Sequence, residues 1–183
     1  MTGVYEKNDY LKNIEIFWEN DGNYGPEDIA ISGQTLYAGY HDGVIMSSLG
    51  KFCNTGGRPL GMVFDANNNL IVADAIKGLI SINQQGVATT LSTKSDTDGI
   101  PLNFTDDLDI ANDGKIYFSD ASVKFGYGED RIEVMEHTPN GRLLVYDPKT
   151  KLTTTLLDNL YFANGVAVSP DDSFVLFNET FMY

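Results

Sequence analysis

The feature that most constrains this fold is a repeated hairpin, in which two short apolar strands flank a turn built from Gly, Asn, Asp or Pro. Four copies occur, and their strand pairs span 29–32 with 35–38, 62–65 with 70–74, 108–111 with 115–120, and 166–169 with 174–178. Such turn residues between apolar strands are typical of β-hairpins. A third strand that begins at glycine follows three of the hairpins, at 43–47, 78–83 and 141–147. The pattern predicts an all-β chain.

Fourth strands complete three of these repeats, with predicted positions at 87–91, at 152–157 and, less strongly, at 51–54. The equivalent residues Asp28, Gly61, Asp107 and Gly165 are separated by 33, 46 and 58 residues. Four strands in each unit of about forty residues indicate the blades of a β-propeller. A sandwich and a β-solenoid stay open as alternatives, but neither accounts as well for a hairpin followed by glycine.

We therefore predict a partial β-propeller with three full blades and part of a fourth. The predicted segments are an N-terminal strand segment at 1–24 with its strand at 13–18, blade 1 at 25–59, blade 2 at 60–105, blade 3 at 106–163 with a helical insertion at 121–140, and a partial blade 4 at 164–183. Closed propellers typically have about 4–8 blades, so three and a half blades leave open strand edges. Open edges favour pairing with another chain, and a homo-oligomer, most simply a dimer, is expected.

Composition limits the classes of function. The chain has 12 Lys and Arg against 26 Asp and Glu, for a net charge of −14, which disfavours binding to nucleic acids and to anionic membrane surfaces. Cys53 is the single cysteine, so an intrachain disulfide is excluded. The N-terminal residues show no apolar leader, and no apolar stretch approaches the ~20 residues of a membrane span. A cytoplasmic location is expected, with secretion or a periplasmic location left open.

An acidic or amide residue stands just before the first strand in three repeats, at Glu27, Asp106 and Asn164, while the remaining repeat has Leu60 there. Equivalent positions of a propeller converge around its axis, so these three oxygen ligands are predicted to meet at one mouth. Hard oxygen ligands suit calcium or another divalent cation. Alternatively, Asp and Asn at such positions cap turns through side-chain hydrogen bonds, which explains Asp106 and Asn164 but not Glu27.

Other polar and aromatic residues are candidates for either a functional or a structural role. Asp107 is a candidate general base beside the cation or, alternatively, a structural carboxylate that accepts hydrogen bonds from backbone amides. Three acidic residues end the second strands of successive repeats, and we expect them to be structural: Asp74, Asp120 and Glu179. Four residues are candidates to line an apolar pocket: Phe125, Tyr127, Met135 and Tyr161. Arg58 and Arg142 are expected to pair with carboxylates rather than with a substrate anion, and His41 is expected in an exposed turn.

Five segments together resemble the strictosidine synthase-like proteins: residues 25–29, 57–62, 118–120, 139–148 and 163–169. These proteins belong to a superfamily of six-bladed propellers that includes gluconolactonases, regucalcin and paraoxonases. The resemblance implies an active site at one mouth of the central channel. It also implies that Glu27 and Asn164 match two ligands of the catalytic cation in the metal-dependent members. Asp106 matches a further ligand by register, although relatives usually have Asn-Asp where this chain has Asp-Asp.

The same resemblance guides the expected activity. Strictosidine synthases use no metal, and their catalytic glutamate lies in a late blade that has no counterpart here, so a lyase of that type is less favoured. Neither His41 nor His137 lies in a motif that matches the histidine pair of paraoxonases. We expect a calcium-dependent hydrolase of lactones or esters if a complete propeller is assembled, with Asp107 or Asp106 activating water. The alternative is a truncated, non-catalytic binding or assembly module, or a fragment of a longer enzyme.

Overall fold

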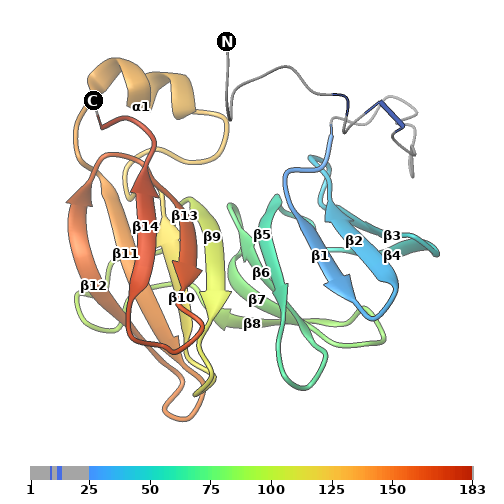
Figure 1. The fold of residues 1–183 in the computed structure, drawn as a ribbon. Helices are drawn as coiled ribbons and strands as arrows, with labels where there is room; N and C mark the ends of the chain where they lie inside the picture. The colour runs from blue at the N-terminus through green and yellow to red at the C-terminus, as the bar shows by residue number, and fades with distance from the viewer. Residues whose placement is uncertain (1–8, 10–11, 14–24, 183) are drawn as a thin grey trace.

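The computed structural model describes residues 9, 12–13 and 25–182. Within these residues the chain forms three four-stranded sheets and one two-stranded sheet, all antiparallel (Figure 1). The predicted fold class, three full blades and part of a fourth, is confirmed. The strand predicted at 13–18 lies outside the described residues, apart from Asn13.

Each sheet is a meander whose strands follow one another in sequence. Blade 1 contains β1 (Ile29–Ser32), β2 (Thr35–Gly39), β3 (Val44–Ser47) and β4 (Gly50–Asn54). Blade 2 contains β5 (Pro59–Phe64), β6 (Leu70–Asp74), β7 (Gly78–Ile82) and β8 (Ala88–Ser92). Blade 3 contains β9 (Thr105–Ile110), β10 (Ile116–Asp120), β11 (Gly141–Asp147) and β12 (Leu152–Leu160), with the helix α1 (Asp130–Glu136) inserted between β10 and β11. The partial blade 4 contains β13 (Ala163–Val168) and β14 (Val175–Glu179).

The first strands of the sheets lie next to one another in the order β1, β5, β9 and β13 (Figure 1). Three of them begin one residue ahead of the predicted blade starts, at Pro59, Thr105 and Ala163. A proline at the first position of a strand is tolerated because no ladder hydrogen bond needs its missing N–H. The inner strands therefore place equivalent repeat positions at one end of the molecule.

The hydrophobic core lies between neighbouring blades. On β6, Leu70 and Val72 pack toward blade 1, whereas Ile71 and Ala73 pack toward blade 3. Since both faces of this strand are covered, its first four residues are all apolar, and every residue of the strand is at most 2% exposed. The outer faces of the first and last sheets, in contrast to the faces of β6, are exposed. Ile31 on β1 is 62% exposed and Leu176 on β14 is 61% exposed.

Aspartates join the inner strands of neighbouring blades. The Met62 amide donates to Asp28 Oδ2 at 2.7 Å, which links blades 1 and 2, and the Val166 amide donates to Asp107 Oδ2 at 2.7 Å, which links blades 3 and 4. Blades 2 and 3 approach directly, because a Cβ on Gly61 would lie 2.8 Å from the Asp107 Cα. Asp28 and Asp107 thus bond to the next inner strand, whereas Gly61 allows the inner strands of blades 2 and 3 to approach closely.

The acidic residues that end the second strands are structural, as their hydrogen bonds show. Each accepts from a backbone amide of the segment that leads into the first strand of its own blade. The pairs are Asp74 Oδ1 with the Arg58 amide at 2.9 Å, Asp120 Oδ1 with the Phe104 amide at 2.7 Å, and Glu179 Oε2 with the Tyr161 amide at 2.6 Å. These carboxylates therefore fix where each inner strand begins.

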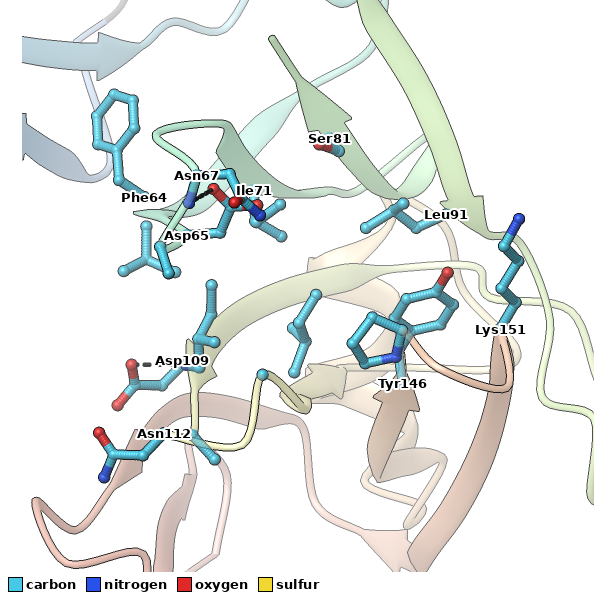
Figure 2. A pocket seen from close by; sticks show the side chains of 17 residues that line it. Phe64, Asp65, Asn67, Ile71, Ser81, Leu91, Asp109, Asn112, Tyr146 and Lys151 are labelled. Carbon is cyan, nitrogen blue, oxygen red and sulfur yellow. Dashed lines mark hydrogen bonds between the residues drawn. The ribbon is translucent and has the colours of Figure 1, made fainter.

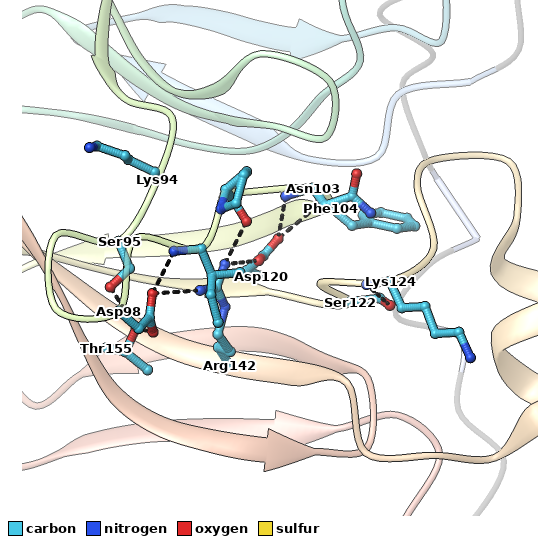
Figure 3. A network of polar contacts seen from close by, with 12 residues as sticks. Lys94, Ser95, Asp98, Asn103, Phe104, Asp120, Ser122, Lys124, Arg142 and Thr155 are labelled. Carbon is cyan, nitrogen blue, oxygen red and sulfur yellow. Dashed lines mark hydrogen bonds and ion pairs between the residues drawn. The ribbon is translucent and has the colours of Figure 1, made fainter.

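Arg142 anchors the most buried polar network (Figure 3). Its Nη2 donates to Asp120 Oδ2 at 2.6 Å and to the Pro101 carbonyl at 2.9 Å, and its Nη1 lies 3.6 Å from Asp98 Oδ1. The side chains of Arg142 and Asp120 are 3% and 0% exposed. Arg142 thus pairs with carboxylates, as expected, and links the segment that follows β8 to blade 3.

Candidate functional site

A cavity of about 690 Å³ opens where the inner strands begin, and Glu27, Asp106 and Asn164 all line it. Glu27 precedes β1, while Asp106 and Asn164 are the second residues of β9 and β13. The three residues that the repeat register selected therefore face one cavity, from three different blades. Leu60, at the same position of blade 2, lines the same cavity as an apolar residue.

The two carboxylates of this trio sit in an unfavourable electrostatic setting. Asp106 is 6% exposed, and its carboxylate accepts no hydrogen bond from the described residues. Burial, together with the charges of Glu27 and Asp107, raises the pKa of Asp106 to about 7, against an opposing effect of Arg58. Partial burial and the charges of Asp28 and Asp107 also raise the pKa of Glu27.

The donor types and charges of these three residues can be compared with what a divalent cation requires. Two carboxylates and one amide oxygen converge, and the more buried carboxylate lacks hydrogen-bond donors that would stabilise its charge. A divalent cation would relieve both the desolvation and the mutual repulsion. The donor types fit a hard, oxygen-binding cation. Within the described residues, no group of three or more His, Cys, Asp and Glu is arranged to hold a metal ion.

Arg58 is the cationic counterpart of this acidic pair. Its side chain is buried, at 8% exposure, and its guanidinium carbon lies 5.7 Å from the Tyr127 ring centroid. Its Nε and Nη1 have no hydrogen-bond partner among the described residues. Arg58 was expected to form an ion pair with a carboxylate. Instead it acts at longer range, where its charge lowers the pKa of both Glu27 and Asp106 against the larger effect of burial.

Aromatic rings form one wall of the cavity. Phe104 contacts Tyr127 and Phe162, with ring centroids 5.8 and 5.3 Å apart, and Phe162 contacts Phe181 at 4.6 Å. Tyr127 was predicted from the sequence to line a pocket, whereas Phe104 and Phe162 were not. A signal for them exists, because each stands two residues before a candidate ligand, the repeat position that Arg58 occupies in blade 2.

The insertion contributes a hydrogen-bonded pair at the rim of the cavity. The Tyr127 hydroxyl lies 2.5 Å from His41 Nδ1, which joins the insertion to the turn after β2. His41 is exposed, as expected for a turn, but it also lines the cavity, which the sequence did not indicate. The pair offers a polar group that can hold or pass a proton beside the aromatic wall.

Of the four residues predicted to line an apolar pocket, Phe125, Met135 and Tyr161 do not line this cavity. Met135 is 86% exposed on α1. Phe125 packs under the Lys124 ammonium group, 5.0 Å from its ring centroid. Tyr161 stacks on His137 with ring centroids 5.0 Å apart, in a smaller cavity nearer the chain end. The direction in which the insertion folds decides the positions of Phe125 and Met135, and strand periodicity carries no information about it.

Asp107 lies beside the cavity rather than in its lining. Its Oδ2 accepts the Val166 amide, and Asp109, on the same face of β9, accepts the Val168 amide at 2.8 Å. Burial raises the pKa of Asp107, and the backbone hydrogen bonds oppose this rise. The geometry is that of the structural alternative, so Asp106 is the better placed of the two candidate bases.

The sheet order defines a partial β-propeller, and residues from three of its blades line one cavity. Two family models match the sequence: the one described as strictosidine synthase over residues 106–183, and the one described as strictosidine synthase-like, N-terminal, over residues 3–47. The chain belongs to the strictosidine synthase-like family.

Individual relatives agree with this assignment. The chain is 40% identical over 169 residues to strictosidine synthase-like protein 4 of Arabidopsis thaliana, which covers 86% of this chain and 45% of that protein. It is 40% identical over 202 residues to the adipocyte plasma membrane-associated protein of Rattus norvegicus, which covers 100% of this chain and 54% of that protein. The chain thus spans about half the length of the curated relatives it matches.

A solved structure shows the same fold. The gluconolactonase of Xanthomonas campestris superimposes with a TM-score of 0.67 at 19% identity, over 85% of this chain and 55% of that chain. In the part of the chain that the structure describes, α1 has 7 residues, and no helix has the length and apolar character needed to cross a membrane.

Proposed function

We propose that this chain provides the ligand-bearing half of the active site of a metal-dependent lactone or ester hydrolase, which acts when a complete propeller is assembled. The observation that carries the proposal is the convergence of Glu27, Asp106 and Asn164 on one cavity beside an aromatic wall. These residues would hold calcium or another divalent cation. Calcium takes about 6–8 oxygens, so the remaining ligands would come from water, substrate or further blades.

A bound divalent cation supplies Lewis acidity toward a carbonyl oxygen. The residues of this chain provide the rest of the chemistry. Phe104 and Phe162 exclude water and contact the apolar part of a substrate. Asp106 is placed to accept a proton from a water molecule in the cavity, since its carboxylate lines the cavity whereas that of Asp107 does not. Asp107 holds β13 in place, so that Asn164 faces the same cavity.

Thermal unfolding at increasing calcium concentration tests the binding part of the proposal. Wild type should gain stability in proportion to the logarithm of the calcium concentration, by about 2.7 kcal/mol at one hundred times the Kd. Glu27→Gln should lose most of that gain. Glu136→Gln removes the same charge from the end of α1, where Glu136 pairs with Lys124, and should respond like wild type. An equal response of all three proteins would contradict the site.

Activity is tested separately, with an aromatic lactone and phenyl acetate as substrates. Asp106→Asn should lower kcat by about a hundredfold or more, the usual contribution of a general base. Asp107→Asn should chiefly lower stability, because its carboxylate orders a neighbouring strand. If Asp107→Asn removed activity while its unfolding midpoint and calcium response stayed at wild-type values, the assignment of the base would pass to Asp107.

The second candidate is a non-catalytic assembly module, and the exposed outer faces of the two terminal sheets favour it. Ile29 and Ile31 on β1 are 54% and 62% exposed, and Phe174 and Leu176 at the last hairpin are 55% and 61% exposed. We propose that a second copy of the chain covers these faces in a homodimer. Light scattering after size exclusion should give twice the chain mass of 20.1 kDa, and Leu176→Lys should reduce it. A monomer at high concentration would exclude the dimer.

The cytoplasmic location expected from the sequence also stays a prediction.

A further inference from the structure

A second cavity, of about 590 Å³, lies between blades 2 and 3 (Figure 2). It is formed at the ends of β5 and β9, the opposite end of the inner strands from the candidate metal site. All of its lining residues belong to blades 2 and 3, both of which have four strands. Its walls therefore do not depend on how further blades or a second chain complete the ring. Its volume lies within the range of about 300–1,000 Å³ typical of small-molecule sites.

Aliphatic side chains form the body of this cavity. Ile71 and Ile116 belong to the core between blades 2 and 3, and Leu91 and Ile110 pack against that core while remaining partly accessible. The strands that carry them, β6, β8, β9 and β10, are part of the sheets and hold these side chains in fixed positions. The cavity thus offers an apolar surface for a ring or a short hydrocarbon chain.

A hydroxyl and an ammonium group without partners face this apolar space. Tyr146 is 4% exposed, yet its hydroxyl makes no hydrogen bond to the described residues. Lys151 forms no ion pair among those residues, although the chain carries 26 acidic side chains. In Figure 2 the Tyr146 ring points toward Leu91, and the Lys151 side chain rises on the same side of the cavity. The Tyr146 hydroxyl is not among the fully buried atoms, so it reaches the cavity and can donate a hydrogen bond to a ligand atom there.

The carboxylates in the lining, by contrast, are already engaged. Asp65 Oδ1 accepts the Asn67 amide at 2.9 Å within its own turn. Asp109 accepts the Val168 amide through Oδ2 and its neighbouring Ile110 amide through Oδ1. On the opposite side, the Tyr146 hydroxyl and the Lys151 ammonium group are hydrogen-bond donors, and Lys151 is cationic. Donors of this kind select an anionic group.

We infer that this cavity binds a small apolar carboxylic acid. The aromatic or aliphatic part lies among Ile71, Leu91 and Ile110, and the carboxylate accepts hydrogen bonds from the Tyr146 hydroxyl and the Lys151 ammonium group. The cavity is thus a second ligand site, separate from the candidate metal site in position and in chemistry. It requires neither a metal ion nor the proposed hydrolase activity.

Isothermal titration of the full chain with 2-naphthoate tests this inference. Wild type should bind one naphthoate per chain, and the neutral analogue 2-naphthamide should bind about tenfold more weakly. Lys151→Met should weaken naphthoate binding about tenfold, and Tyr146→Phe by about threefold to tenfold. Lys149→Met is the matched control, because it removes the same charge from the same turn outside the cavity lining, and it should bind like wild type.

Three results would overturn the inference: no saturable binding in the millimolar range, equal affinity for the acid and the amide, or equal affinity of Lys151→Met and Lys149→Met. Leu91→Trp should fill the cavity and abolish binding. If that variant does not fold, the two lysine variants decide, since both alter exposed side chains. Naphthoate should leave the calcium-dependent shift in unfolding temperature unchanged in size, so a failure of the metal site and a failure of this site are distinguishable.

Discussion

Replacing Asp106 with asparagine should stabilise the metal-free protein at neutral and higher pH. The Asp106 side chain is almost fully buried and its carboxylate accepts no hydrogen bond, and its pKa rises from 3.8 to about 7 in the folded chain. Between those values the folded protein binds a proton that the unfolded chain does not. The free energy of unfolding of wild type should therefore fall as pH rises from about 4 to about 7, and level off above that.

The magnitude follows from the difference in pKa. About three pKa units at 1.36 kcal/mol each amount to a penalty on the order of 4 kcal/mol at pH 8. The asparagine amide replaces a charge with a polar group that also lacks partners, which costs about 1–2 kcal/mol. A net gain of roughly 2–3 kcal/mol remains. For a chain of this size that gain corresponds to a rise in the unfolding midpoint of roughly 4–12 °C.

Thermal unfolding followed by circular dichroism in EDTA, at pH 8 and at pH 4, is the assay. Asp106→Asn should unfold above wild type at pH 8 and lose that advantage at pH 4. Asp158→Asn is the control, because the Asp158 carboxylate is exposed on β12 and bonds only to the neighbouring Asn159 side chain. Calcium at saturating concentration should reverse the order, since only wild type keeps the buried carboxylate. A variant less stable than wild type at pH 8 in EDTA would refute the electrostatic account of the site.

Two further predictions concern the packing of the blades. Arg142→Met leaves the fully buried Asp120 carboxylate without its cation, and thermal unfolding should show a loss of about 3–5 kcal/mol. Lys115→Met, which breaks an exposed ion pair, should leave the midpoint unchanged, and equal effects of the two would contradict the importance of burial. Gly61→Ala should destabilise by about 1–3 kcal/mol in urea unfolding, because its Cβ would press on the backbone of β9. Gly25→Ala, with open space around it, should be neutral, and a neutral Gly61→Ala would show that blades 2 and 3 separate easily.

Much of the fold could be predicted because its signals are local. Turn residues between alternating apolar residues specify each hairpin, and the register of the repeat aligns equivalent positions of successive blades. The same register selected Glu27, Asp106 and Asn164, and these do face one cavity. It also contained an unused signal, since the position two residues earlier supplies the aromatic wall.

Other features of the site are decided only by the tertiary structure, because they depend on distances between blades and on the path of the insertion. Asp107 and Asp106 are neighbours in sequence, yet one bonds to the next blade while the other faces the cavity, because successive side chains of a strand point to opposite faces. His41 and Tyr127 meet because the insertion folds back over the mouth. The cavity near Tyr146 and Lys151 is formed by residues of two neighbouring sheets. Sequence periodicity reports which face a residue occupies, whereas the packing of sheet against sheet determines what lies opposite that face.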